Sequence, residues 1–161
     1  MTRKLTLTEI NEALLGCAID GNPDNVEEML AQGARIDMRD AAGKTALHFA
    51  AAYGHLAVMR VLLDNGADID DQTYDAKLTP LHMAAHHRKA AAAKLLVEKG
   101  ADVSLRDNEK RTAEDIFPEI ARFIFRKSPA PKAPPAPTAV DIVLEHQKKM
   151  RRIAPKAGPR L

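Results

Sequence analysis

The chain has 161 residues, of which 45% are hydrophobic and 29% charged. This length excludes a barrel of eight strands and eight helices, which needs about 250 residues, and it suits one domain with a tail. Aromatic residues make up only 4% and Trp is absent, so the core must be aliphatic and rich in Ala, which favours closely packed helices. The net charge of +2 is unevenly spread, because residues 126–161 hold nine of the 24 basic residues but only two of the 22 acidic ones.

The N-terminal segment predicts a helix and no targeting signal. Thr6 and Glu9 have the spacing of a capping box. Polar residues interrupt every apolar run here, which argues against a signal peptide, and no stretch of the chain approaches the roughly 18 apolar residues of a membrane span. We therefore expect a cytoplasmic protein. The alternative is a secreted bacterial effector or adaptor that is exported through a basic C-terminal signal.

The strongest feature of the sequence is an internal repeat. Residues 43–70 match residues 77–104 at an offset of 34, and the two read GKTALHFAAAYGHLAVMRVLLDNGADID and KLTPLHMAAHHRKAAAAKLLVEKGADVS. In the first copy, small and apolar residues crowd 45–53, which predicts a buried helix. Apolar residues recur at helical spacing over 56–63, which predicts an amphipathic helix. Such a unit cannot bury its apolar face alone and must stack on neighbours.

The repeated motifs resemble the ankyrin family. TALHFAA at 45–51 and TPLHMAA at 79–85 are each followed by a Leu pair and Gly-Ala-Asp. The resemblance covers about 8–125 and implies an all-α solenoid of helix–turn–helix units, the first and last being incomplete as terminal caps. In the last unit we expect Pro118 to begin a helix over 118–126. The four units are expected at about 8–39, 40–73, 74–106 and 107–126.

The third unit departs from the second at two glycine positions and in one turn. Arg88 stands where the second unit has Gly54, and Lys77 where it has Gly43. The turn near Thr73 contains one extra residue, so the sequence alone does not fix the register of that turn.

The basic C-terminal segment divides into a linker and a tail. Residues 127–137 are rich in proline, which predicts an extended, semi-rigid linker. Residues 138–161 form the basic tail, with a short amphipathic helix expected over 138–151. A helix of that length is marginal alone, so it should be ordered only where something accepts its apolar face.

No pattern in the sequence indicates catalysis or a cofactor. The glycines form neither a dinucleotide fingerprint nor a phosphate-binding loop, and no GxSxG element is present. His82, His86 and His87 are spaced closely enough to suggest a metal site. The ankyrin resemblance instead implies that His48 and His82 bond to backbone and to the neighbouring threonine. We therefore expect no enzyme, no cofactor, no metal and no small-molecule substrate.

Two further groups of residues also have structural interpretations. The dense carboxylates between Asp64 and Asp75 lack the spacing of a calcium loop, so we expect a solvated edge of turns. Cys17 falls on the inner helix of the first unit, where a buried, inert thiol is expected.

The ankyrin resemblance implies a surface for a partner protein. In that family the turn tips and inner helices form a concave surface that binds other proteins. By position, the exposed ends of the inner helices are Ile19 and Asp20, Ala52 and Tyr53, and His86 and His87. An exposed Tyr offers a partner both a ring and a hydroxyl at little cost in rotamer entropy. The predicted partner-binding residues are Lys44, Tyr53, Tyr74, Asp75, Leu78, His86, His87 and Arg111.

The sequence therefore favours a non-catalytic protein-interaction module. The basic tail has two possible roles in addition to this interaction module. It is either an intramolecular cap or secondary binding segment for the repeat body, or a site for an anionic surface such as nucleic acid or a membrane. The absence of aromatic residues after Phe125 weighs against nucleic acid, because base stacking is then unavailable.

Overall fold

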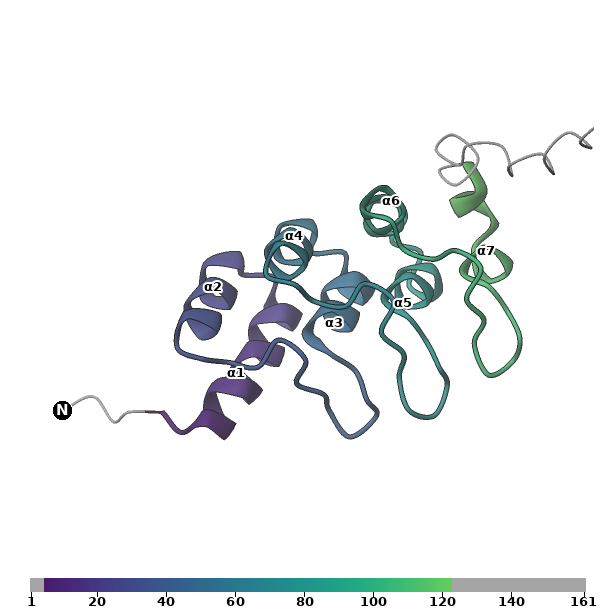
Figure 1. Ribbon diagram of the computed structural model, residues 1–161. Coiled ribbons are helices and arrows are strands. Elements are labelled where there is room, and N and C mark those ends of the chain that lie inside the picture. The colour runs from purple at the N-terminus through teal and green to yellow at the C-terminus, as the bar shows by residue number, and fades with distance from the viewer. Residues whose placement is uncertain (1–4, 123–161) are drawn as a thin grey trace, which may run out of the picture. The chain divides into compact units, whose positions relative to one another are not determined.

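A computed structural model describes residues 5–122 (Figure 1). The chain separates into two units, 1–127 and 128–161, and every described residue belongs to the first. The predicted linker, the predicted helix over 138–151 and the last residues of the predicted helix over 118–126 lie outside the described residues.

The described part of the chain is all-helical, as predicted. Its helices follow one another in four pairs and are joined by loops, with no strand among residues 5–122. The predicted helices over 45–53 and 56–63 are confirmed. The elements are α1 (Leu7–Asp20), α2 (Pro23–Ala31), α3 (Ala46–Tyr53), α4 (Leu56–Asp64), α5 (Pro80–His86), α6 (Ala90–Lys99), α7 (Ala113–Ile116) and the 3-10 helix η1 (Pro118–Ile120).

The helices form two rows. Helices α1, α3, α5 and α7 contact one another in sequence as an inner row, and α2, α4, α6 and η1 form the outer row. The long loops that precede α3, α5 and α7 project from the inner row on one side (Figure 1). Each unit therefore contacts only its neighbours, as in a solenoid.

Threonine starts each inner helix. Thr6, Thr45, Thr79 and Thr112 are N-caps of α1, α3, α5 and α7, and each forms a capping box with the residue three positions later. The partner is an acid in the two end units and a histidine in the two central ones. A capping box satisfies two backbone N–H groups that the helix itself leaves without acceptors.

The core lies between the two rows and consists of aliphatic side chains. Leu14, Leu47, Leu62, Leu81 and Leu96 are fully buried. Each contributes about 1.5–3 kcal/mol through removal of apolar surface from water. The inner helices carry buried alanines at their contacts, so their backbones approach closely and the rows pack without gaps. These alanines are Ala18, Ala46, Ala50, Ala51, Ala84, Ala85 and Ala113.

Two predictions about exposure are wrong. Ala52, expected at the exposed end of the inner helix, is only 4% exposed. Cys17, expected to be buried, is half-buried and packs at the margin of the core. Partial burial and the nearby Asp20 carboxylate raise the pKa of the Cys17 thiol, so the thiolate is disfavoured there.

The last unit follows the prediction over the described residues, and the prediction for 123–126 lies outside them. Pro118 begins a helix as expected, but its first turn is the 3-10 helix η1, with α-helical residues only at 121–122 before the described part ends. Phe117 and Ile120 bury the apolar side of this unit.

Candidate partner-binding surface

Each projecting loop is a hairpin closed by a matching backbone hydrogen bond. The N–H groups of Asp40 and Asp107 donate to the carbonyl four residues later, at 2.9 Å in both loops. In the intervening loop the N–H of Thr73 donates to Leu78 O, five residues later, at 3.0 Å. This bond places the extra residue inside the turn, between Thr73 and Leu78, and settles the register that the sequence left open. The three closing hydrogen bonds show which positions are equivalent in the three hairpins, namely Lys44, Leu78 and Arg111.

The hairpins are linked to one another through their backbones. Tyr74 N–H donates to Ala42 O at 3.1 Å, and Asn108 N–H donates to Ala76 O at 3.0 Å. The Asn108 side-chain amide also donates to the carbonyl of Asp75. The three loops are therefore held as a connected set, which reduces the entropy that binding would otherwise cost.

Two buried histidines fasten the helices to these loops. The backbone N–H of Thr45 donates to His48 Nδ1, and His48 Nε2 lies 2.9 Å from Leu78 O in the next unit. His82 repeats the arrangement with Thr79 and with Arg111 O, at 3.1 Å. An Nε2-protonated ring satisfies every one of these bonds. The structural role expected for both histidines is confirmed, and His82 has no free nitrogen for a metal.

Burial keeps these two rings neutral. Desolvation lowers the pKa of His48 and of His82, and it outweighs the opposing effect of the carbonyl that each Nε2–H meets. A protonated Nδ1 would also face the Thr45 or Thr79 N–H, donor against donor. The interaction between successive units is therefore favoured by neutral or alkaline pH.

A second link between units, which sequence reasoning missed, centres on Arg39. Its guanidinium donates to the carbonyls of Gly43 and Gln72 and to the Asp71 carboxylate, and it lies 5.6 Å from the centre of the Tyr74 ring. Asp71 is therefore not part of a solvated edge, as expected for 64–75, because its side chain is only 11% exposed in this ion pair. The sequence contained little indication of this pair, because the matching positions in the next unit are Gln72 and Leu105, which cannot form an ion pair.

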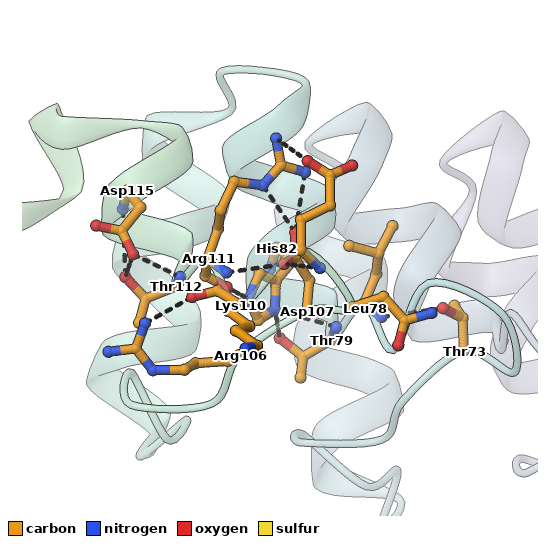
Figure 2. A network of polar contacts seen from close by, with 12 residues as sticks. Thr73, Leu78, Thr79, His82, Arg106, Asp107, Lys110, Arg111, Thr112 and Asp115 are labelled. Atoms are coloured by element: carbon orange, nitrogen blue, oxygen red, sulfur yellow. Dashed lines mark hydrogen bonds and ion pairs between the residues drawn. The ribbon is translucent and has the colours of Figure 1, made fainter.

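Arg111 and Asp107 form an ion pair within the last loop (Figure 2). Arg111 Nε and Nη2 both donate to Asp107 Oδ2, at 3.1 and 3.0 Å, and the Asp107 side chain is 2% exposed. Burial acts to raise the pKa of the Asp107 carboxyl. The hydrogen bonds from Arg111 and from backbone N–H groups outweigh this effect and hold the pKa below its usual value. Arg111 Nη1 lies 3.0 Å from Glu109 Oε2.

The exposed ends of the inner helices form the other half of the surface. Tyr53 is 51% exposed, and its ring stacks on His55 with centroids 6.0 Å apart. His55 Nε2 is in turn 2.9 Å from Ile19 O, so this histidine connects the first unit to the second. His86 and His87 are exposed at the end of α5.

The structure brings only some of the predicted residues together. Leu78, His86 and Arg111 line one hollow of about 200 Å³, whose remaining lining residues are Ala76, Asp107, Asn108 and Glu109. Tyr74 and Asp75 are exposed on the same hairpin as Leu78 but do not line the hollow. Lys44 is half-buried, with Nζ 5.7 Å from the centre of the Phe49 ring. Tyr53 does not line the hollow. Asp107 was not predicted as a site residue, and only its spacing from Arg111 could have indicated it.

The described residues show no assembled metal or membrane site. Within residues 5–122, no group of three or more His, Cys, Asp or Glu side chains is arranged to hold a metal ion. In the same part of the chain, no helix has the length and apolar character needed to cross a bilayer.

The family of the chain follows from its repeats. A model of ankyrin repeats in three copies matches residues 12–113, more than half of the chain. The chain belongs to the ankyrin-repeat family, whose members generally serve as protein–protein interaction modules.

Several curated proteins share this repeat region. Human protein phosphatase 1 regulatory subunit 27 is 37% identical over 81 residues, covering 48% of this chain and 53% of that protein. Human ankyrin repeat domain-containing protein 39 is 35% identical over 71 residues, covering 43% and 39%. A Caenorhabditis elegans transient receptor potential cation channel subfamily A member 1 homolog is 44% identical over 68 residues, covering 39% and 6%. The chain thus spans about half or less of the length of these relatives.

Proposed function

We propose that the chain is a non-catalytic binding module that holds a partner protein against one face of its repeat stack. This binding face consists of the projecting hairpins and the exposed ends of the inner helices. Its predicted contact residues are Lys44, Tyr53, Tyr74, Asp75, Leu78, His86, His87 and Arg111. The proposal is supported above all by the linkage between hairpins, because a surface built from three connected loops is already ordered before a partner arrives.

The exposed tyrosines give this face its binding capacity. Tyr53 and Tyr74 are 51% and 62% exposed, and they are among the few large apolar side chains exposed within residues 5–122. Tyr74 is held by Arg39 and Tyr53 rests against His55. Aromatic side chains that are fixed before binding are frequent energetic hot spots, since little rotamer entropy remains to be lost.

The relatives support a regulatory or binding role. One is named as a regulatory subunit of a phosphatase, and we extend to this chain only the coarser inference, that it acts by binding another protein. No catalytic set is proposed.

The binding face is tested by comparing partner capture. The full chain, a Tyr53→Ala/His87→Ala variant and an Arg60→Ala control would be used to capture partners from the source cell extract. Arg60 is exposed on α4, in the outer row. We expect a specific partner to be retained by the control and lost, by tenfold or more, by the double variant. A partner held equally by all three folded proteins would exclude this face.

We also propose that the basic tail acts on the same function, as an intramolecular cap or a secondary binding segment. The charge distribution supports this, because residues 126–161 carry nine basic and two acidic residues while the rest of the chain is acidic overall. Replacing Lys148, Lys149, Arg151 and Arg152 with Gln in the full chain should change either stability or partner affinity. If neither changes, but binding to DNA or to anionic vesicles falls and depends steeply on salt, the tail instead serves an anionic surface.

A further inference from the structure

The hollow lined by Leu78, His86 and Arg111 combines an apolar wall with one fixed cation. Ala76 and Leu78 of one hairpin supply the apolar part, and Arg111 of the next hairpin supplies the charge. A volume of about 200 Å³ suits a single side chain of a partner rather than a small-molecule ligand, for which pockets of about 300–1,000 Å³ are usual.

The buried Asp107 carboxylate holds the Arg111 guanidinium in one orientation. Asp107 is buried, and its Oδ1 accepts the backbone N–H groups of Glu109 and Arg111, both at 2.9 Å. Its Oδ2 accepts Nε and Nη2 of Arg111. Two nitrogens of the guanidinium are thereby committed to the protein itself, and Nη1 remains for an external group.

The group now beside Nη1 is easily replaced. Glu109 lies 3.0 Å from Nη1, but its side chain is 70% exposed. An exposed ion pair of this kind stabilises a protein by about 0–1 kcal/mol. Rotation of the Glu109 side chain into water would open Nη1 at little cost, while the Arg111–Asp107 pair stayed in place.

We propose that this hollow receives an acidic side chain of the partner protein, whose carboxylate replaces Glu109 at Arg111 Nη1. The aliphatic part of the incoming side chain then contacts Ala76 and Leu78, which favours Glu over Asp. Lys77 and Lys110, exposed on the same two hairpins, form no ion pair within residues 5–122 and add positive potential. Glu109 thus acts as an internal competitor. This inference rests on the proposed function, because it names the chemistry that part of the binding face recognises.

The test uses paired peptides and a charge-matched control. A set of 12-residue peptides, each synthesised with Glu and with Gln at its centre, is titrated against the full chain by fluorescence polarisation. The same titrations are made with Glu109→Gln, Glu119→Gln and Arg111→Gln. Glu119→Gln removes one exposed negative charge from the same unit, as Glu109→Gln does, but Glu119 lies on η1, outside the binding face, and forms no ion pair with Arg111.

We expect Glu peptides to bind more tightly than their Gln partners, and Glu109→Gln to raise their affinity about two- to fivefold, because the competitor is gone. Glu119→Gln should change it by less than half as much, and Arg111→Gln should abolish the Glu preference. The far-ultraviolet circular dichroism of each variant confirms that it is folded, and Glu109→Gln changes only an exposed side chain.

Two results would overturn the inference. One is the absence of any Glu-over-Gln preference. The other is an equal gain in affinity from Glu109→Gln and Glu119→Gln, which would mean that the loss of a negative charge anywhere in the unit, and not displacement of Glu109, raises the affinity. Neither result would contradict the proposed function. That proposal is excluded only if the Tyr53→Ala/His87→Ala variant binds the partner as well as the unmodified chain does.

Discussion

At the scale of single residues, the structure depends on side chains that bond in two directions. His48 and His82 each bind their own helix through Nδ1 and the next loop through Nε2. Both are essentially inaccessible to water. The partners of the two ring nitrogens lie in different units. One side chain therefore caps its own helix and also joins that helix to the next unit.

The first prediction is a large loss of stability in His82→Ala. The change leaves the Thr79 N–H and the Arg111 carbonyl without their partner and opens a cavity. An unsatisfied buried polar group costs about 1–3 kcal/mol, so we expect a loss of about 2–4 kcal/mol in the free energy of unfolding, measured with urea. His87→Ala, at an exposed ring, should stay within about 0.5 kcal/mol of the unmodified chain. Equal effects of the two changes would contradict the assigned role of His82.

The second prediction is that stability falls on mild acidification. The pKa of His48 and His82 is lowered in the folded state by burial, so below about pH 6.5 the unfolded chain binds more protons than the folded one. Stability is therefore complete above pH 6.5 and declines as pH falls toward the folded-state values. Each ring contributes a slope of at most about 1.4 kcal/mol per pH unit.

The measurement is urea unfolding at pH 7.5, 6.5 and 5.5. A His48→Gln/His82→Gln variant serves as the comparison, because Gln can still close the capping box with Thr45 and Thr79. It should be less stable at pH 7.5 but show a flatter pH dependence. An unchanged slope in that variant would mean that other groups cause the effect.

At the scale of elements, the hairpins show how much the sequence could predict. The internal repeat correctly predicted the helices α3 to α6, and the ankyrin resemblance correctly implied the roles of both histidines. Neither of them predicted the ion pair of Arg39 with Asp71, or the burial of Ala52, because these depend on how neighbouring units pack rather than on a recurring pattern. The register near Thr73 needed the observed bond to Leu78.

The third prediction concerns the left-handed positions in these hairpins. Gly43 has φ 81° and an added Cβ would lie 2.7 Å from the Tyr74 backbone nitrogen. Its equivalent Lys77 has φ 51° without being Gly. Gly43→Ala should lower the free energy of unfolding by about 2 kcal/mol or more, through the clash and the backbone strain. Lys77→Gly should leave it unchanged or raise it by up to about 1 kcal/mol. Thermal unfolding of both variants tests this, and a stable Gly43→Ala variant would contradict the packing of the two hairpins.

At the scale of the whole molecule, stability is a sum of contacts between neighbouring units. Within residues 5–122, each helix of the inner row packs against its own outer-row partner and against the inner helices of the adjoining units. The end units have a neighbour on one side only within the described residues, and α7 has four residues. The central units therefore receive support from two interfaces and the ends from one.

The fourth prediction is a gradient of local stability along the stack. Backbone amides of α3 and α5 should exchange with solvent water more slowly than those of α1 and α7, since opening a terminal unit breaks one interface rather than two. Native-state hydrogen exchange on the full chain measures this gradient. Uniform exchange in all four helices would indicate that the stack opens only as a whole.

The central claim is that a partner protein lies against the hairpins and inner-helix ends. Site-specific photo-crosslinking tests it most directly, with a photoreactive phenylalanine analogue placed at position 53 in one sample and at position 60 in another. We expect a partner protein to be captured covalently from position 53, on the binding face, and not from position 60, on the outer row. Capture from position 60 with none from position 53 would contradict the account.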